Sequence, residues 1–371
     1  MTAGQEHPAR QPKAEPRAQA KPVPGASHER APISIRIAWV GDIVMEVPWR
    51  KSTIPPKQLF DGVRQRLKTS DLVIANLETP LTDWPEQTPH KNKADLEAGR
   101  DVVFRVASAE AARALSGAGI RVAALANNHT VDYTVHGLLD TISRLHRAGV
   151  LSVGAGVNLS AAESALVIKL QGWRVGILSF SDVVPKYSWA KPNHPGIATA
   201  KESERLVAAV RRARPRVDIL IVVLHWGVQF DRQPSPRQEF LAQETQRAGA
   251  DLILGSHPHV LQGVGCLGRV PVVYSAGNFV FPTLSQPTRR TAIFEFEFSG
   301  GPTPLVRLVP AMIDERGAPQ LVEAQPAEEI LSEASQLSLP LGLRFDGDSG
   351  SCSEAPPPPA PASSTDNPEV H

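Results

Sequence analysis

Five apolar, strand-like segments of this chain each end in polar residues of the kinds that bind metal ions. The segments cover residues 33–40, 71–75, 121–126, 218–224 and 251–254. Helical patterns, with apolar residues three and four positions apart, separate most of them at 57–67, 108–117, 134–148, 201–213 and 236–248. This alternation of strands and helices predicts an α/β fold in which several strands run parallel.

Two further patterns predict antiparallel strands. Residues 165–170 and 175–180 are separated by a segment that contains Gln171-Gly172, which is typical of a hairpin. Residues 291–298 alternate phenylalanine with glutamate, which suits an antiparallel or edge strand. We therefore predict a layered α/β/α sandwich with mixed β-sheets over residues 33–313, followed by a peripheral extension at 314–350.

The ends of the chain and its composition argue against several classes of protein. Residues 1–32 and 351–371 are rich in proline and are predicted to be disordered. Lys plus Arg number 39 against 38 Asp plus Glu, so the net charge of +1 gives no general reason to bind nucleic acid. No segment approaches the roughly 20 apolar residues of a membrane span, and the first residues lack the apolar stretch of a signal peptide. We expect a soluble protein, cytoplasmic as written, or extracytoplasmic if the printed start omits a leader.

The polar residues at the strand ends are expected to meet in one place. In an open α/β sheet, the crevice beyond the carboxyl ends of the strands is where ligands bind. Each residue alone is a common turn, cap or hydrogen-bonded residue, but their combination in one chain favours a metal site. Imidazole, carboxylate and amide groups suit Mn, Fe, Zn and similar ions. The candidates are Asp42, Glu78, Asn127, Asn128, His129, His225, His257 and His259.

The segment His257-Pro258-His259 is the most specific of these motifs. Proline restricts the backbone, and in an extended conformation residues two apart point the same way. We therefore predict an extended segment that presents both imidazole rings to one ion.

The cysteines carry no comparable signal. Only Cys266 and Cys352 occur, and neither lies in a CxxC or other ligand spacing. We expect neither a disulfide framework nor a structural zinc knuckle, and the redox compartment is left open.

In order and separation, these motifs resemble the CapA family of poly-gamma-glutamate capsule biosynthesis proteins, within the calcineurin-like metallophosphoesterase superfamily. The resemblance spans most of the predicted core. It is carried by Gly41-Asp42, Asn76-Leu77-Glu78, residues 126–141, His225-Trp226-Gly227, and residues 257–263 and 274–279.

The resemblance implies a metallophosphoesterase-like sandwich that holds one or two divalent ions, whether Mn, Fe, Zn, Mg or Ca. It implies that His129 is the general acid, and that Asp132 either orients His129 or caps the helix that follows. The implied metal ligands are Asp42, Glu78 in the bridging position, Asn128 through its amide oxygen, His225, His257 and His259.

Four residues are predicted to contact substrate. Asn127 and Asn278 fall within the matching motifs, and Lys186 and Lys191 lie in a long loop that follows a predicted strand. Loops of this kind often act as lids, and the two lysines suit an anionic ligand such as a phosphate or a glutamate carboxylate.

The chain also departs from the family pattern. Gln229 and Gly265 stand where the family often has glutamates, which bears on substrate recognition more than on metal binding. The membrane anchor frequent in capsule members is missing as well, so we do not assume capsule synthesis.

Three functions are compatible with these residues. The first is metal-dependent hydrolysis of a phosphoester or a glutamyl or peptide-type substrate, in which the metal activates water and His129 protonates the leaving group. The second is peptide epimerisation at the same site, by abstraction of a proton next to a metal-bound carbonyl. The third is a non-catalytic accessory subunit that binds the proteins of a polymer-synthesis complex, in which metal only stabilises the fold.

Overall fold

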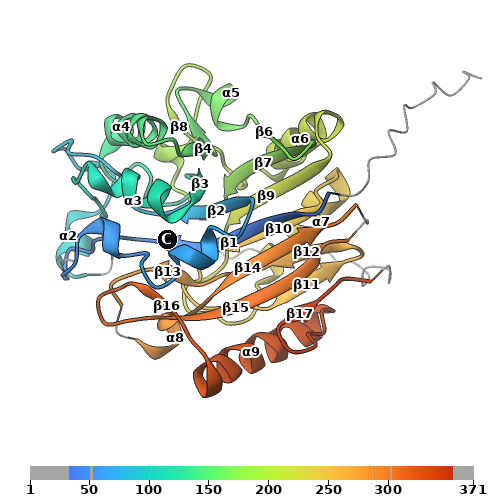
Figure 1. Cartoon of the computed structure of the whole chain (residues 1–371). Helices are drawn as coiled ribbons and strands as arrows, with labels where there is room; N and C mark the ends of the chain where they lie inside the picture. The colour runs from blue at the N-terminus through green and yellow to red at the C-terminus, as the bar shows by residue number, and fades with distance from the viewer. Residues whose placement is uncertain (1–32, 51–52, 100, 284, 301–302, 354–371) are drawn as a thin grey trace, which may run out of the picture. The chain divides into compact units, whose positions relative to one another are not determined.

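Two mixed β-sheets pack face to face in the computed structural model, which describes residues 33–50, 53–99, 101–283, 285–300 and 303–353 (Figure 1). In the first sheet, β1 (Ile35–Ile43), β2 (Leu72–Leu77), β3 (Ile120–Ala124) and β4 (Leu151–Val153) run parallel. On the other side of β1, the strands β14 (Arg290–Phe298), β15 (Leu305–Ile313) and β16 (Pro319–Leu321) are antiparallel. Two short strands, β13 (Asn278–Val280) and β17 (Ser349–Gly350), pair with β1 and β15.

The second sheet has the strand order β11-β12-β10-β9-β7-β6. Its parallel centre consists of β7 (Trp173–Ser181), β9 (Ile219–His225), β10 (Leu252–Ser256) and β12 (Val270–Val273). The edge strands β6 (Leu166–Leu170) and β11 (Val264–Leu267) are antiparallel to their neighbours. A separate two-stranded sheet pairs β5 (Ala155–Gly156) with β8 (Gly196–Ile197).

Most of the helices cover the outer faces of the two sheets. Among the described residues they are α1 (Arg64–Leu67), α2 (Lys93–Glu97), α3 (Glu110–Ala118), α4 (Thr134–Arg147), α5 (Leu159–Ala162), α6 (Ser203–Ala213), α7 (Pro236–Ala248), α8 (Gln286–Arg289) and α9 (Ala324–Ser338). Short 3-10 turns occur at Pro56–Gln58, Lys186–Ser188, Arg214–Arg216 and Leu339–Leu341. Apolar side chains of α1, α3 and α4 share a core with the first sheet, and those of α6 and α7 share one with the second. The predicted mixed α/β class is confirmed, with helices outside and two sheets between them.

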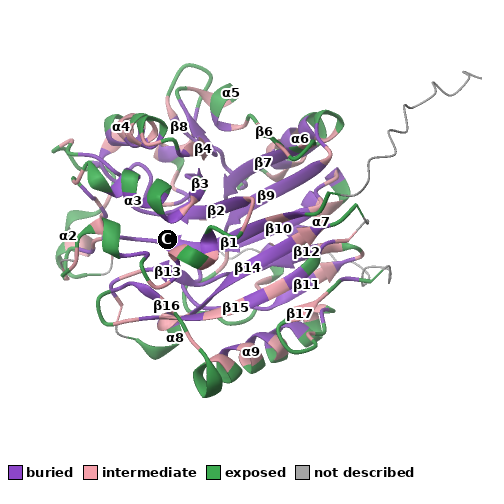
Figure 2. Ribbon diagram, viewed as in Figure 1, coloured by how far each residue is buried: buried purple, intermediate pink, exposed green. Residues whose placement is uncertain are grey.

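The alternation along the central strands explains this layering. In β1, Ile37 and Trp39 enter the core between the sheets, whereas Ala38 and Val40 face the helices on the outer side. In β9 the same period places Ile221 between the sheets and its neighbours outside. Because both faces are covered, these strands are apolar over most of their length, and Figure 2 shows them almost entirely buried.

Local sequence signals account for several element boundaries. Helix α7 begins where Ser235 and Gln238 form a reciprocal capping box and ends at Gly249 in the left-handed conformation. The predicted hairpin is confirmed, because Gln171 and Gly172 both have positive φ and join β6 to β7.

The predicted helix over 57–67 is wrong in its length. The structure has a 3-10 turn at Pro56–Gln58 and only α1 at the end of that range. Between them Gly62 lies so close to Gln320 that an added Cβ would come within 2.1 Å of its Oε1. Glycine is a weak helix former, and here it serves close packing on β16 instead.

The stretch 314–350, predicted as a peripheral extension, supplies β16, α9 and β17. Ile330 and Ala334 of α9, with Leu343, are buried in the core between the sheets. The segments 1–32 and 354–371, which the sequence predicts to be disordered, lie outside the described residues.

The expectation about the cysteines is wrong. Cys266 on β11 and Cys352, which we assigned to the C-terminal tail, form a disulfide across 86 residues of sequence. The spacing of the two cysteines in the sequence gave no sign of this disulfide, because it forms only when β11 and the segment after β17 are brought together by folding.

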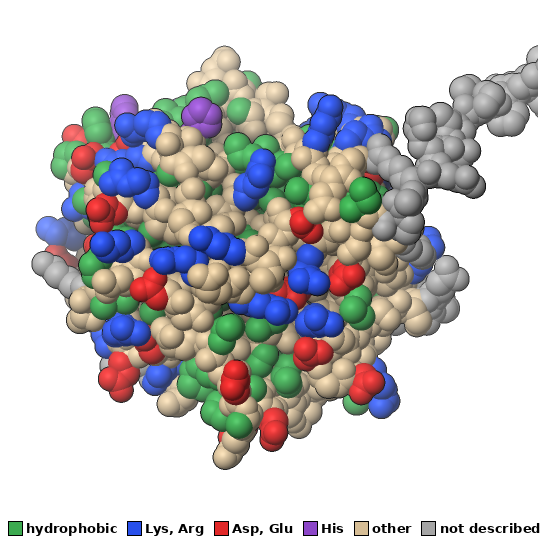
Figure 3. Space-filling model, viewed as in Figure 1, with side chains coloured by type: hydrophobic (Ala, Val, Ile, Leu, Met, Phe, Trp, Pro, Cys, Tyr) green, Lys and Arg blue, Asp and Glu red, His purple; other side chains and the backbone are tan. Residues whose placement is uncertain are grey.

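The surface is electrostatically mixed. Figure 3 shows Lys and Arg side chains interspersed with Asp and Glu over the visible face. Within the described residues, no helix is long and apolar enough to cross a membrane.

Candidate metal centre

The candidate ligands come together where the parallel strands of both sheets end. Asp42 lies near the end of β1, Glu78 directly follows β2, and His225 is the last residue of β9. His257 directly follows β10, which is parallel to β9. The carboxyl ends of β1, β2, β9 and β10 therefore bring ligand-type residues from distant parts of the chain into one buried cluster.

A glycine next to Asp42 lets the backbone approach closely enough to build the site. The Asp42 amide donates to the Gly277 carbonyl at 2.9 Å, and the pairing of β1 with β2 shifts register at this point. An added Cβ on Gly41 would lie 1.9 Å from the Gly277 oxygen, so only glycine fits. The glycine of the Gly-Asp motif is thus explained by the close approach of β1 to the segment that leads into β13.

One half of the cluster surrounds Nε2 of His225. The Asn128 amide oxygen lies 2.7 Å from this nitrogen, and His257 Nδ1 lies 3.1 Å from it. The other ring nitrogen, Nδ1, lies 3.0 Å from Ser256 Oγ and 3.4 Å from Asn76 Nδ2. His225 is therefore oriented from behind while its Nε2 faces other ligand-type atoms.

The other half contains Asp42 and His259. Nδ1 of His259 lies 3.2 Å from Asp42 Oδ2 and 2.9 Å from Asn278 Oδ1. The second Asp42 oxygen accepts a hydrogen bond from Asn76 at 2.8 Å.

Glu78 belongs to both halves. Its ligand atom and those of His257 and His259 all lie within 4.8 Å of one another, and Oε1 is 3.5 Å from His225 Nε2. The side chain is buried, yet neither carboxylate oxygen accepts a hydrogen bond from a described residue. Burial, reinforced by the nearby Asp42 charge, raises the pKa of Glu78 to about 8. A buried carboxylate without hydrogen bonds, placed between imidazole nitrogens, fits a divalent cation.

The histidines have the protonation properties that metal ligands need. Burial, with the repulsion of neighbouring histidines, lowers the pKa of His225 and of His257 well below the usual value. Both rings are therefore neutral near pH 7 and have a lone pair to offer. Burial also disfavours charge on His259, but Glu78 and Asp42 outweigh it and raise the pKa of His259 to about 9. The positive charge that the carboxylates attract is thus supplied by this ring in the absence of another cation.

His129 and Asp132 form a pair at the edge of the cluster. His129 Nδ1 lies 2.8 Å from Asp132 Oδ2, which leaves Nε2 for another group. Burial lowers the pKa of His129, although Asp132 opposes the effect. Helix α4 begins two residues later with no side-chain cap, so the structure supports orientation of His129 and not helix capping as the role of Asp132.

The predicted backbone of the His-Pro-His segment is wrong. His257 has φ of 103° and His259 has φ of 60°, so both lie in the left-handed region and not in an extended conformation. Both rings nonetheless reach the cluster. Positive φ at a residue with a side chain is costly, and such strain is concentrated at functional sites.

Two of the residues predicted to contact substrate are used within the protein. The Asn127 amide donates to the Leu77 carbonyl at 2.8 Å, and its oxygen accepts from the His129 amide at 3.1 Å. Asn278 orients His259 and donates to the Thr288 carbonyl at 3.1 Å. Their side-chain amides are buried and hydrogen-bonded within the protein, where they support the cluster.

The two predicted substrate lysines lie on the surface. Lys186 begins a 3-10 turn, and Lys191 pairs through its backbone with His194 and accepts from Leu159. Within the described part of the chain, neither ammonium shares a hydrogen bond or ion pair with the cluster. The structure brings together the predicted metal ligands and the His129–Asp132 pair, but not these lysines.

The two departures from the family pattern lie in different surroundings. Gln229 is exposed and precedes Phe230, whose ring centroid is 6.2 Å from that of His259. Gly265 lies in β11, where an added Cβ would come within 2.9 Å of the Tyr274 ring, so a glutamate would not fit there.

Several residues that support the site were not predicted from the sequence. Asn76 belongs to a quoted motif and Ser256 directly precedes the His257-Pro258-His259 segment, and this position beside the ligands was the available signal. Lys91 and Phe104 come from the loop between β2 and α3, and their sequence context carries no sign of a role. The Lys91 ammonium pairs with Asp132 at 2.9 Å, and the Phe104 ring lies 4.2 Å from that of His129.

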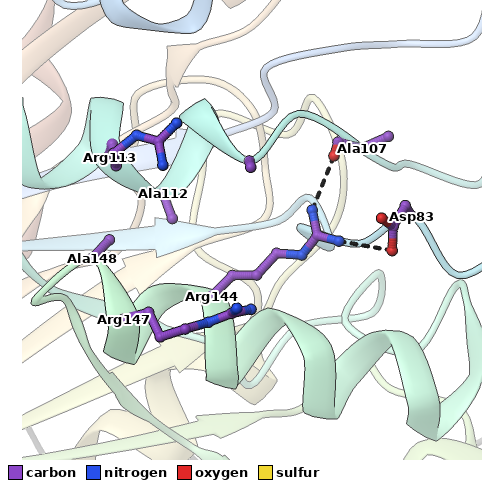
Figure 4. A pocket seen from close by; sticks show the side chains of 8 residues that line it. Asp83, Ala107, Ala112, Arg113, Arg144, Arg147 and Ala148 are labelled. Atoms are coloured by element: carbon purple, nitrogen blue, oxygen red, sulfur yellow. Dashed lines mark hydrogen bonds and ion pairs between the residues drawn. The ribbon is translucent and has the colours of Figure 1, made fainter.

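A cavity of about 300 Å³ lies elsewhere, between α3 and α4 (Figure 4). Arg113, Arg144 and Arg147 line it, but Arg144 is already held by Asp83 at 2.8 Å and by the Ala107 carbonyl at 2.9 Å. The cavity shares no residue with the cluster, so the chemistry of the strand ends does not extend to it.

Comparison with known proteins points to one group. Residues 36–283 match the family described as bacterial capsule synthesis protein PGA_cap. Capsule biosynthesis protein CapA of Bacillus anthracis is 33% identical over 78% of this chain and 69% of its own length. PGA biosynthesis protein CapA of Bacillus subtilis is 33% identical over 75% of this chain and 71% of its own.

Two further proteins match with lower coverage or lower sequence identity. A protein of Mycobacterium tuberculosis named "Probable polyglutamine synthesis accessory protein" is 31% identical over 57% of this chain and 56% of its own. The solved NAD nucleotidase of Haemophilus influenzae aligns over 81% of this chain and 55% of its own, with 12% identity and a TM-score of 0.40. That structural similarity carries no conclusion about activity.

Proposed function

Since this chain belongs to the bacterial capsule synthesis protein family, we propose that it is a metal-dependent hydrolase of a phosphoester or a glutamyl or peptide-type substrate. The proposal includes a link to poly-gamma-glutamate biosynthesis, which the CapA resemblance implies and which is supported by the names of the Bacillus relatives, one a capsule and the other a PGA biosynthesis protein.

The observation that supports it most is the state of Glu78. This carboxylate is buried with both oxygens lacking hydrogen bonds, beside His225, His257 and His259. A buried carboxylate without hydrogen bonds is costly to ionise, and a divalent cation between it and the imidazoles would stabilise its charged form.

The distances within the cluster support a proposed assignment of its ligands to two ions. Asn128, His225 and His257 would hold one ion, Asp42 and His259 a second, and Glu78 would contribute to both. When bound, such ions polarise a phosphoryl or carbonyl oxygen and lower the pKa of a coordinated water. His129 holds its Nδ1 against Asp132, so its Nε2 is the atom that would deliver a proton to the leaving group.

A second function uses the same residues. An epimerase would need a group that removes a proton next to a polarised carbonyl, and Nε2 of His129 is available for that as well. Solvent deuterium incorporated at a substrate Cα without bond cleavage would favour this function over hydrolysis.

The third candidate is an accessory role without catalysis. It is suggested by the name of the Mycobacterium tuberculosis relative. On this view the metal stabilises the fold, and the protein binds polymer-synthesis enzymes.

The deciding experiment begins with metal content. The full chain and a His257→Ala/His259→Ala variant are purified without an affinity histidine tag, and bound metals are measured by plasma mass spectrometry. We expect between one and two equivalents in the first and a loss in the second. The loaded protein is then assayed with bis(p-nitrophenyl) phosphate and with γ-glutamyl-p-nitroanilide. Bound metal without turnover of either would favour the accessory role, and protein that binds no added metal would overturn the hydrolase.

The role of His129 is tested in the same assay. His129→Ala should lower turnover by about 10²–10⁴-fold while leaving the metal content unchanged. His136→Ala is the matched control, because His136 is an exposed histidine on α4 that stacks on Trp84. Equal turnover by the two variants would exclude His129 as the proton donor.

A further inference from the structure

The loop between β2 and α3 folds back over His129. Its two ends are held together by hydrogen bonds from the Thr82 amide to the Val106 carbonyl at 3.0 Å and from the Val106 amide to the Pro80 carbonyl at 2.9 Å. Between these ends, the Thr88 amide donates to the Asp132 carbonyl at 2.8 Å. The loop is therefore attached to the segment that carries the His129–Asp132 pair.

This loop buries a lysine. The Lys91 side chain is 7% exposed, and its ammonium pairs with Asp132 Oδ1 at 2.9 Å and with Asp101 Oδ1 at 3.2 Å. It also donates to the Val102 carbonyl. Together with His129 Nδ1 at 3.5 Å, these groups surround the ammonium and hold it inside the protein.

Lys91 completes the surroundings of the Asp132 carboxylate. Oδ2 accepts from the Phe104 amide at 2.8 Å and faces His129 Nδ1 at 2.8 Å, while Oδ1 faces the ammonium. Oδ2 therefore has two hydrogen-bonding partners, whereas Oδ1 has the ion pair with Lys91 and no hydrogen bond from a described residue. Rotation of the carboxylate away from His129 would break that ion pair. The Phe104 ring, 4.2 Å from that of His129, restricts the imidazole from the side.

The hydrogen-bond pattern defines the tautomer of His129. A carboxylate accepts, so Nδ1 carries the hydrogen and Nε2 keeps its lone pair in the neutral ring. The Lys91 ammonium also lies near Nδ1, at 3.5 Å, but Asp132 Oδ2 is closer at 2.8 Å, so the carboxylate is the main partner of Nδ1.

We propose that Lys91 is a positioning residue, which holds Asp132 against Nδ1 of His129 and so maintains the tautomer whose Nε2 can accept and donate the proton of the reaction. The proposal rests on the proposed function for its catalytic consequence. Its structural part, the link from Lys91 through Asp132 to the His129 tautomer, stands apart from any activity.

The test reads the tautomer directly. Imidazole nitrogen NMR spectra are recorded on the full chain loaded with Zn²⁺, with His129→Gln used to assign the signal. In the unsubstituted protein we expect the Nδ1–H form alone. In Lys91→Met, which keeps the length but loses the charge, we expect exchange between the two tautomers. Lys91→Arg should restore the original spectrum.

Turnover of bis(p-nitrophenyl) phosphate gives the second reading. Lys91→Met should lower kcat about tenfold or more with KM and metal content unchanged, and Lys91→Arg should recover most of the loss. Lys93→Met is the matched control, because Lys93 lies two residues away with a side chain that is 88% exposed. That control should behave like the unsubstituted protein in both measurements.

An unaltered His129 tautomer in folded Lys91→Met would overturn the proposal. If that variant does not fold, Lys91→Gln is used, since it also removes the ammonium and should shift the tautomer in the same direction. An unchanged spectrum in that variant would equally overturn the proposal. If the unsubstituted protein shows no turnover, the proposed hydrolase function is contradicted. The structural link from Lys91 through Asp132 to the His129 tautomer is not, because the NMR spectra require no substrate.

Discussion

Glu78 differs from two other carboxylates of the protein, those of Asp42 and Glu297, in being buried without hydrogen bonds. Its two oxygens lie in the interior without hydrogen bonds, while Asp42 has Asn76 and His259 as partners. The same residue type at position 297 is half-buried on β14 and pairs with Arg36 at 3.6 Å. What distinguishes Glu78 is therefore burial without hydrogen bonds, which fits the proposed role of a metal ligand.

We expect Glu78→Gln to abolish the stabilisation that metal gives. Mn²⁺ at a hundred times its dissociation constant should stabilise the unsubstituted protein by about 2.7 kcal/mol, which raises Tm by several degrees. The variant should show almost no change in Tm, because the charge shared by both halves of the cluster is gone. Thermal unfolding with and without Mn²⁺ measures this. Glu297→Gln, the surface control, should keep the full response, and a Glu78→Gln protein with an intact response would rule out Glu78 as a ligand.

At the scale of the elements, the site depends on how closely two backbone segments approach. Strand β1 and the turn before β13 meet at Gly41 and Gly277, and the ladder between β1 and β13 aligns Asp42 with Asn278. The ligand Asp42 and the residue that orients His259 are thus neighbours because two glycines permit it.

Gly41→Ala should separate these segments. With its Cβ 1.9 Å from the Gly277 oxygen, the variant should lose about 2–3 kcal/mol of stability and much of its metal affinity. Chemical denaturation and metal titration measure the two effects. Gly117→Ala is the control, because an added Cβ in this position of α3 meets nothing within 4 Å. There the helix should gain up to about 1 kcal/mol, and equal behaviour of the two variants would refute the packing argument.

The contact between α1 and β14 depends on one buried ion pair. Glu295 faces the outer side of the first sheet with a side chain that is 3% exposed, and Arg66 of α1 binds it through two nitrogens at 2.8 and 2.7 Å. The antiparallel strand predicted for 291–298 is confirmed, but the sequence could not show that Glu295 is buried.

Arg66→Met should therefore be strongly destabilising. It leaves the Glu295 carboxylate buried without its partner, which costs about 3 kcal/mol. Lys93→Met, which breaks the exposed pair with Glu97, should cost less than about 0.5 kcal/mol. Urea unfolding of both variants gives the comparison, and similar losses in the two would contradict the assigned burial of Glu295.

At the scale of the whole described unit, the C-terminal segment closes the structure. Helix α9 covers the region where the two sheets meet, and the disulfide joins β11 of the second sheet to the segment that follows β17 of the first. The link spans 86 residues, so it removes much conformational freedom from the unfolded chain.

Cys266→Ser/Cys352→Ser should lower the free energy of unfolding by about 2–4 kcal/mol. A reducing agent should produce a loss of similar size in the unsubstituted protein and none in the variant. Denaturant unfolding with and without dithiothreitol measures both. A protein whose stability is indifferent to reduction would show that the two sulfurs are not bonded in solution.

The sequence by itself determined the parallel strands, the helices between them and the kinds of residue at the strand ends. These features depend on local periodicity and on turn residues, which act over a few positions of the chain. The hairpin at Gln171-Gly172 and the start of α7 at Ser235 are of this kind.

Only the tertiary structure decided which of those residues work together. The burial of Glu78 without hydrogen bonds, the left-handed backbone of His257 and His259, and the contact of Lys91 with Asp132 all depend on segments far apart in the chain. The disulfide was missed for the same reason. Local patterns specify the period and the ends of elements, whereas burial and charge pairing depend on packing between elements, which no local pattern encodes.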